Sequence, residues 1–202
     1  VAVLVYFRRD LAEMARFDRA GRRMITIIVI GTIPAVILGL AFESRLDELT
    51  ERPSAVAVML IVTGLILLAT MLIRPGGRTA EDLTPTDAGL IGLAQSFALI
   101  PGVSRSGMTI SAGLVRGMQR VEAARFAFLL GIPVIAGAGL LSVVRAVSEG
   151  SGITGATVVG MIVAAITGYW AIAFLLRVIA KAGLAPFGIY CVAFGAIALV
   201  AL

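Results

Sequence analysis

One short segment of the sequence carries residues that could bind a phosphorylated ligand. It covers residues 101–107, reads PGVSRSG and lies between two apolar runs. Arg105 is its strongest candidate, because an arginine at membrane depth is costly and persists mainly when it pairs with an anion. A planar guanidinium matches two phosphate oxygens at once. The segment therefore predicts an anion-binding loop in which Arg105 holds a phosphorylated ligand.

No acidic residue near this segment in the sequence offers Arg105 a counter-charge. The acidic residues around it fall in expected loops or at expected helix ends: Glu81, Asp82, Asp87, Glu122 and Glu149. We therefore expect the partner of Arg105 to be a ligand, or a carboxylate from a segment upstream of Val1.

Neighbouring residues supply further parts of an anion site. Gly102 and Gly107 permit close approach of the backbone, while Ser104 and Ser106 offer hydroxyl donors. We expect a helix to start at Gly107, with Ser106 as its cap and free N–H groups at residues 107–109. Those N–H groups and the positive end of the helix dipole would add to the attraction for an anion.

A simpler alternative is that Pro101 and Gly102 only kink a long helix, with the serines bonding back to its carbonyls. An arginine between two serines, with apolar sequence on both sides, favours the ligand site. Gln95 precedes the loop and can line the same cavity, although hydrogen bonding between helices explains it equally well.

The composition places the chain in a membrane. Hydrophobic residues make up 59% of it, charged residues make up 14%, and the mean hydropathy is +1.04. Soluble domains are about half apolar and a quarter charged. The apolar runs lack the alternation of a barrel strand, so helices must satisfy the backbone in lipid. We expect an all-α, polytopic helical membrane protein that forms one domain over residues 1–202.

The remaining charged and reactive residues exclude several classes of site. The net charge of +5 does not indicate nucleic-acid binding, because the arginines lie at the ends of apolar runs. The chain has no histidine, the commonest general base at neutral pH. Its single cysteine, Cys191, excludes a disulfide framework and a cysteine metal site, and we interpret it as a small buried residue.

Five apolar runs are long enough to cross a membrane. Residues 1–7 read as the end of a further, truncated span, so we expect a segment upstream of them. The positive-inside rule puts the arginine-rich residues 8–23 in the cytoplasm and fixes the direction of each span. The expected spans are residues 24–42, 55–73, 126–144, 153–176 and 184–202.

Residues 88–115 break this pattern. The apolar run 88–100 has thirteen residues, so at ~1.5 Å per residue it reaches roughly 20 Å into a ~30 Å core. A second short helix then returns to basic sequence, so both ends of the segment lie on the cytoplasmic face. We expect a re-entrant helix-loop-helix whose loop opens toward the outer face. Such a loop is tolerated only where protein buries it or where it lines a watery cavity.

The sequence around the loop resembles a known family. Residues 98–110 (ALIPGVSRSGMTI) are similar to the second signature of undecaprenyl-diphosphatase, the bacitracin-resistance family of integral membrane phosphatases. Residues 7–11 (FRRDL), Gln95 and residues 124–126 (ARF) agree with the family as well. The resemblance extends along essentially the whole chain.

The resemblance implies hydrolysis of undecaprenyl diphosphate to undecaprenyl phosphate and inorganic phosphate, assisted by Mg²⁺ or Ca²⁺. This reaction recycles the lipid carrier for cell-wall synthesis and confers bacitracin resistance. The family implies a bacterial plasma (inner) membrane location with the active site toward the outer face. Carried over by position, Arg105 clamps the diphosphate, Ser104 and Ser106 bind its oxygens, and Thr109 helps at the helix start.

One part of the family pattern is absent from these 202 residues. The first signature, a re-entrant segment with the glutamates, serines and histidine that complete the metal site, has no counterpart in the sequence. We therefore expect the metal ligands in an upstream segment, none in this chain, and no activity from the chain alone. In the family each half contains one hairpin and three spans, so we also expect an inverted repeat.

Two other functions stay open from the sequence. A transporter or flippase for a phosphorylated polyprenyl lipid would use the same arginine and helix dipole without cleavage. A channel subunit with an anion filter is a weaker interpretation, because one arginine forms a ring only through oligomerisation. A homo-oligomer is left open. So is the nucleophile, because Ser104 or Ser106 without a base is a poor one.

Overall fold

The described part of the chain is built from α-helices. The computed structural model describes residues 1–74, 76–148 and 154–202 and contains no β-strand within those ranges. The architecture is therefore all-α. The helices are α1 (Ala2–Tyr6), α2 (Arg8–Met14), α3 (Arg19–Thr50), α4 (Pro53–Ala69), α5 (Pro85–Phe97), α6 (Arg105–Val115), α7 (Arg120–Ser148), α8 (Gly155–Ala182) and α9 (Ala185–Ala201), with short 3-10 turns at Thr70–Leu72 and Ala80–Asp82.

Four of the described helices are long and apolar enough to cross a membrane, so the chain is polytopic. Their candidate spans are Arg19–Phe42 in α3, Pro53–Leu72 at α4, Arg120–Val144 in α7 and the whole of α8. α9 is also apolar but has 17 residues. At ~1.5 Å per residue it reaches about 26 Å, slightly less than a ~30 Å hydrocarbon core.

The spans expected from the sequence fall on these helices. Residues 24–42, 55–73, 126–144 and 184–202 fall on α3, α4 with its 3-10 turn, α7 and α9. The expected span 153–176 falls on α8, apart from Ile153, which lies outside the described residues. The end of the connector before it, from residue 149, lies outside them as well.

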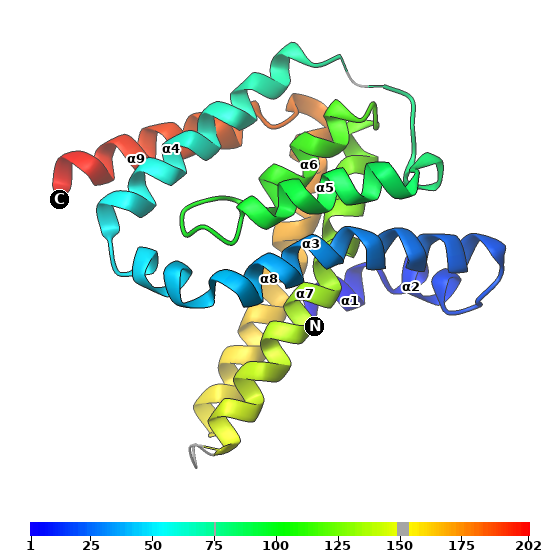
Figure 1. The fold of residues 1–202 in the computed structure, drawn as a ribbon, viewed down its shortest axis with the longest axis horizontal. Helices are drawn as coiled ribbons and strands as arrows, with labels where there is room; N and C mark the ends of the chain where they lie inside the picture. The colour runs from blue at the N-terminus through cyan, green and yellow to red at the C-terminus, as the bar shows by residue number, and fades with distance from the viewer. Residues whose placement is uncertain (75, 149–153) are drawn as a thin grey trace.

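α5 and α6 form the helix-loop-helix expected at residues 88–115. α5 has 13 residues and α6 has 11, so neither helix is long enough to cross a ~30 Å core. Figure 1 shows the two helices side by side, with the connecting loop next to α4. α5 begins earlier than the apolar run, at Pro85, because Thr84 and Asp87 form a capping box around its first turn.

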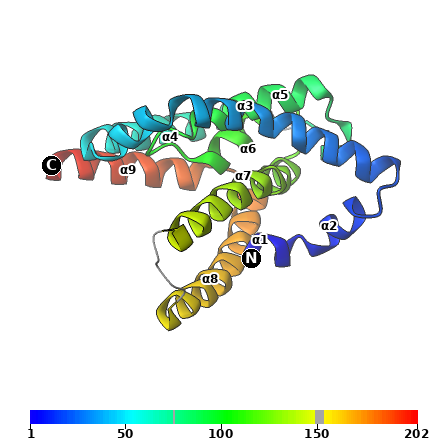
Figure 2. The ribbon, with the colours of Figure 1, turned by 60° about the horizontal axis from the view of Figure 1, so that its bottom comes forward.

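α3, which comes before the hairpin in the sequence, and α7, which follows it, both pack against the hairpin. α5 packs on α3, where a Cβ at Gly92 would collide with the main chain of Gly31, and α6 packs on α7. Buried side chains from three of these helices meet in the core, among them Ile91, Ile110 and Leu130. Figure 2 shows α1 separately, against α8. The hairpin therefore has protein on several sides, as an irregular backbone at membrane depth requires.

α4 and α9 form a tight antiparallel pair. Both helices have 17 residues and a proline in the first turn. Gly64 of α4 faces Gly188 of α9 so closely that a Cβ on either glycine would lie 2.7 or 2.9 Å from the other's oxygen, and Ala57 faces Gly195. Equal length and opposite direction are what an inverted repeat would require of its last two spans. The repeat as a whole stays a prediction.

A buried carboxylate closes the base of the hairpin. Asp87, in the first turn of α5, is 1% exposed. It accepts hydrogen bonds from Arg78 Nη2 at 2.7 Å, from Arg116 Nε at 2.6 Å, and from the hydroxyl and N–H of Thr84 at 2.8 and 2.9 Å. Arg116 follows the end of α6, so Asp87 links the start of the first hairpin helix to the end of the second.

The arrangement keeps Asp87 ionised. Burial alone would raise the pKa of Asp87, but its hydrogen bonds to the two arginines and to Thr84 outweigh burial and hold the pKa well below the usual range. A carboxyl group with a lowered pKa in the folded state stabilises the fold above the ordinary aspartate pKa of ~3.9. That contribution is lost as the pH falls below about 4 toward the lowered value.

We expect Asp87→Asn to lower the free energy of unfolding by on the order of 2 kcal/mol at pH 7. This is less than the ~3–5 kcal/mol typical of breaking a fully buried ion pair, because Arg78 and Arg116 are 33% and 39% exposed. At pH 7, thermal unfolding in detergent can be followed through the buried thiol of Cys191, which reacts with a maleimide dye only when exposed. At lower pH it is followed by the loss of helical circular dichroism, because maleimide reacts with the thiolate.

Asp18→Asn is the matched control. The Asp18 side chain caps α3 by accepting from Gly21 N at 2.8 Å, and asparagine caps a helix about as well. The difference between the wild-type chain and Asp87→Asn should shrink as the pH falls below about 4. A difference that stays constant from pH 7 to pH 3 would contradict this account.

Candidate functional site

Turns in the backbone carry the chain from α5 to α6. The N–H groups of Leu99, Ile100 and Val103 donate to carbonyls three residues earlier, at 3.1 to 3.2 Å. These bonds pair part of the loop backbone internally. The remaining polar groups of the loop must find partners on neighbouring helices, because lipid offers none.

The two glycines of the loop segment lie close to α4. Gly102 has a φ of +90°, and a Cβ there would collide with the main-chain oxygen of Val56 in α4. A Cβ on Gly107 would lie 3.0 Å from the Leu67 side chain, also in α4. The close approach predicted for these glycines is thus to α4. Their contact with a ligand stays a prediction.

Ser104, not Ser106, caps the second helix. The backbone of Ser104 is extended and its Oγ accepts from Gly107 N at 3.1 Å, so α6 begins at Arg105. The prediction that the helix starts at Gly107 with Ser106 as its cap is wrong by two residues. The sequence offers a serine on each side of Arg105, and the tertiary position of the loop selects the first. Ser106 falls in the first turn of the helix.

This shift changes which main-chain donors are free. Gly107 N donates to Ser104 Oγ, and Met108 N donates to the carbonyl of Ser104 at 2.9 Å. The N–H groups of these two residues, which were expected to be free, are therefore already paired. In the described part of the chain, no hydrogen bond is present from the N–H of Arg105 or Ser106. These two donors, at the positive end of the α6 dipole, are the ones open to an anion.

Arg105 is the first residue of α6, and no carboxylate of the described residues pairs with it. Within the described residues no ion pair involves it. Its Nη1 is 3.5 Å from the carbonyl oxygen of Gly131 in α7, a long and weak contact. A Cβ on Gly131 would lie 3.2 Å from Nη2, so glycine leaves room for the guanidinium. The charge is therefore held in place but not neutralised, and Glu149 lies outside the described residues.

Two further predicted residues lie inside the hairpin. Thr109 is buried, and its hydroxyl donates to the carbonyl of Arg105 at 2.8 Å. Its oxygen can still accept, but its proton is used. Gln95 is 1% exposed, and neither its amide oxygen nor its amide nitrogen has a hydrogen-bond partner among the described residues. A buried amide without partners costs about 1–3 kcal/mol, so Gln95 stays a candidate for contact with a ligand or water.

The loop does not have the ligands of a metal site by itself. Among the described residues no group of three or more His, Cys, Asp or Glu side chains could hold a metal ion. The loop offers hydroxyls and a guanidinium, whereas Mg²⁺ and Ca²⁺ prefer carboxylates and other oxygens. These residues fit an anionic ligand and not a cation.

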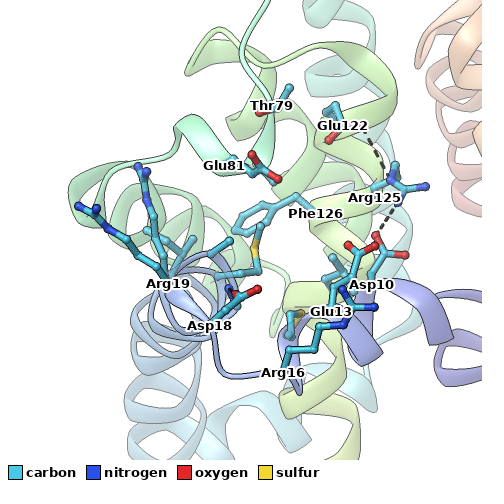
Figure 3. A pocket seen from close by; sticks show the side chains of 18 residues that line it. Asp10, Glu13, Arg16, Asp18, Arg19, Thr79, Glu81, Glu122, Arg125 and Phe126 are labelled. Carbon is cyan, nitrogen blue, oxygen red and sulfur yellow. Dashed lines mark hydrogen bonds and ion pairs between the residues drawn. The ribbon is translucent and has the colours of Figure 1, made fainter.

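A cavity of ≈ 840 Å³ lies elsewhere, between α2, α3 and the start of α7. Figure 3 shows its charged lining, where Arg125 pairs with Asp10 and Glu122. Its lining contains five carboxylates and four arginines: Asp10, Glu13, Asp18, Glu81, Glu122, Arg16, Arg19, Arg23 and Arg125. This balance does not favour an anion. None of the residues predicted for the anion site lines the cavity.

Sequence reasoning missed two residues that position the loop. Thr63 is fully buried in α4, and its hydroxyl contacts both Gly102 and Ser104. It is the one polar side chain between Ala55 and Ala69, which is the signal that could have identified it. Asp87 was assigned to a helix end without a role. No sequence pattern shows that its carboxylate is buried beneath two arginines.

Comparison with known proteins places the chain in a family. Residues 1–197 match the family described as "Bacitracin resistance protein BacA". The chain is 39% identical over 200 residues to the protein named undecaprenyl-diphosphatase from Pelobacter propionicus, covering 93% of this chain and 73% of that protein. It is 40% identical over 210 residues to the protein of that name from Rubrobacter xylanophilus, covering 98% and 77%. The chain therefore belongs to the family of bacitracin resistance protein BacA.

Proposed function

We propose that this protein hydrolyses undecaprenyl diphosphate to undecaprenyl phosphate and inorganic phosphate. The single observation that carries the proposal is Arg105, whose guanidinium has no carboxylate partner among the described residues and lies beside free N–H groups in a hairpin loop. The relatives named undecaprenyl-diphosphatase support the same reaction. They also disfavour the transporter or flippase, whose predicted anion site would be identical.

Arg105 would bind the diphosphate and stabilise charge that moves during the reaction. The anhydride P–O bond breaks as water adds to the terminal phosphorus, and the lipid phosphate leaves with an additional negative charge. A fixed guanidinium in a water-poor site stabilises that charge more strongly than the same group in water. Its fork geometry also holds two oxygens at once, which fixes the orientation of the leaving group.

The start of α6 would supply neutral donors for the same anion. The N–H groups of Arg105 and Ser106 point out of the first turn, and a helix N-terminus attracts anions through such groups. Ser104 Oγ accepts from Gly107 N, so its own proton stays available to donate. Ser106 lies in the same turn and offers a second hydroxyl. The predicted contacts of Ser104 and Ser106 with phosphate oxygens are thus compatible with the helix start.

We also propose that a divalent cation, Mg²⁺ or Ca²⁺, takes part, as the family resemblance implies. When bound, such an ion would neutralise diphosphate charge and polarise a phosphoryl oxygen. The described residues of this chain supply the anion contacts and no carboxylate cluster for the ion. Its protein ligands would therefore come from outside the hairpin loop.

The charge distribution supports a loop that opens to the outer face of the bacterial plasma membrane. Arg78 and Arg116 lie at the base of the hairpin, and arginines are also abundant in residues 8–23. Positive charge collects on the cytoplasmic side of membrane proteins. A hairpin with its base on that side directs its loop outward.

Arg105 is the residue whose loss should slow the reaction most. We expect Arg105→Ala to lower kcat/KM for phosphate release from undecaprenyl diphosphate by about 10²–10³-fold, the range for loss of one transition-state charge contact. Arg105→Lys keeps the charge but loses the planar fork, so its loss should be smaller, on the order of tenfold. Phosphate release in detergent with Mg²⁺ or Ca²⁺ measures both. The assay uses two forms of the protein, the 202-residue chain and a form extended upstream of Val1.

Arg177→Ala is the control, because Arg177 is exposed on α8 and the substitution changes the net charge equally. It should leave kcat/KM unchanged. Release that is equally fast in Arg105→Ala and in the wild-type protein would remove Arg105 from the site. Tight lipid binding without any release, in every form of the protein, would favour the transporter over the phosphatase.

The second prediction concerns the cation. We expect EDTA to abolish phosphate release and excess Mg²⁺ or Ca²⁺ to restore it, because neutralisation of the diphosphate depends on the ion. Thermal unfolding, followed by Cys191 labelling, should be affected little, since the described residues form no metal cluster whose loss would unfold them. Full activity after exhaustive chelation would show that the reaction needs no divalent cation.

A further inference from the structure

We propose that Thr63 of α4 is a positioning residue for the reaction, which holds the loop so that Ser104 and Arg105 meet the diphosphate in one fixed geometry. This inference rests on the function proposed above. Thr63 does not reach the guanidinium and need not touch the substrate. It acts through the backbone of the loop.

The hydroxyl of Thr63 joins two main-chain groups of the loop. It donates to the carbonyl oxygen of Gly102 at 3.3 Å and accepts from the N–H of Ser104 at 3.3 Å. A hydroxyl can do both at once, because it has one proton and two lone pairs. The side chain is 0% exposed, so water does not compete for either bond. The Thr63 hydroxyl thus pairs the carbonyl before Val103 and the N–H after it, in place of main-chain partners.

Removal of this hydroxyl would leave two unpaired groups in a place without water. An unsatisfied backbone group at membrane depth costs more than in a soluble protein, because lipid offers no alternative partner. The loop would then move to pair the Gly102 carbonyl and the Ser104 N–H elsewhere. Such a movement shifts the helix start itself, since Ser104 is the cap of α6 and Arg105 is its first residue.

α4 is a rigid base for this contact. The residue after Thr63, Gly64, lies against Gly188 of α9 with no space for a side chain on either glycine. About two turns before it, Val56 lies against Gly102. The packing of α4 against α9 therefore fixes the position of Thr63, and its hydroxyl faces the loop. A rigid support of this kind is what a preorganised anion site needs.

The test compares two substitutions at residue 63 with a control on the same helix segment. Thr63→Val keeps the shape of the side chain and removes the hydroxyl. Thr63→Ser keeps the hydroxyl. Thr70→Val is the matched control, because Thr70 is also buried but its hydroxyl donates only to the carbonyl of Leu67, in the turn before it.

Two readouts are taken on each variant, in the same protein used for the Arg105 assay. The first is amide hydrogen exchange of the peptide covering residues 100–106, which needs no activity. The second is kcat and KM for phosphate release. We expect Thr63→Val to exchange faster in this peptide only, and to lose about ten- to a hundredfold in kcat/KM, mainly in kcat, as expected for reacting groups displaced by about 1 Å. Thr63→Ser and Thr70→Val should resemble the wild type.

Several outcomes would overturn the inference. Unchanged exchange in residues 100–106 of Thr63→Val would show that the hydroxyl does not hold the loop. Equal losses in Thr63→Ser and Thr63→Val would assign the effect to packing of the methyl group. Faster exchange throughout the chain would indicate a general loss of stability. If the wild type releases no phosphate in either form of the protein, the proposed function fails, and the exchange measurement still decides whether Thr63 positions the loop.

Discussion

Every polar group of an irregular backbone at membrane depth must be paired by the protein itself, because lipid supplies no hydrogen bonds. The hairpin of α5 and α6 meets this constraint through specific contacts. Turns within the loop satisfy three N–H groups, Thr63 satisfies Gly102 and Ser104 from α4, and the Ser104 side chain satisfies the start of α6. Among the described residues, the main-chain donors left over at the start of α6 are those of Arg105 and Ser106. These unpaired groups lie at the proposed anion site, and the paired groups fix the position of the loop around it.

The two ends of the hairpin treat charge in opposite ways. At its base, one buried carboxylate receives two guanidinium groups and the first turn of α5, so the cluster around Asp87 is a structural link. At its tip, the only partner of Arg105 within residues 1–74, 76–148 and 154–202 is the distant carbonyl of Gly131. An ion pair at the tip would compete with an anionic lipid head group. At the base, where no ligand is proposed, an unpaired arginine would have no anion to neutralise it.

The hairpin could be predicted from the sequence, because length and composition act locally. The short apolar run before residue 101 was enough to predict a hairpin that does not cross. The anion site predicted from Arg105 between two serines stays a prediction, although no carboxylate pairs with that arginine among the described residues. The choice of cap could not be predicted. Ser104 and Ser106 have the same capping propensity, so the choice depends on tertiary contacts of the loop with α4, which include those of Gly102 and Ser104. Thr63 is about 40 residues away in the sequence, so tertiary packing alone reveals its role.

The length of α6 has a consequence for how the family can vary in evolution. Eleven residues separate the cap at Ser104 from the end of the helix at Val115, about three full turns. At one end Arg105 lies against Gly131 of α7, and at the other end Arg116 pairs with Asp87 of α5. Insertion or deletion of a single residue would rotate one end by about 100° relative to the other. A change in the length of α6 would therefore disconnect the tip of the hairpin from its base.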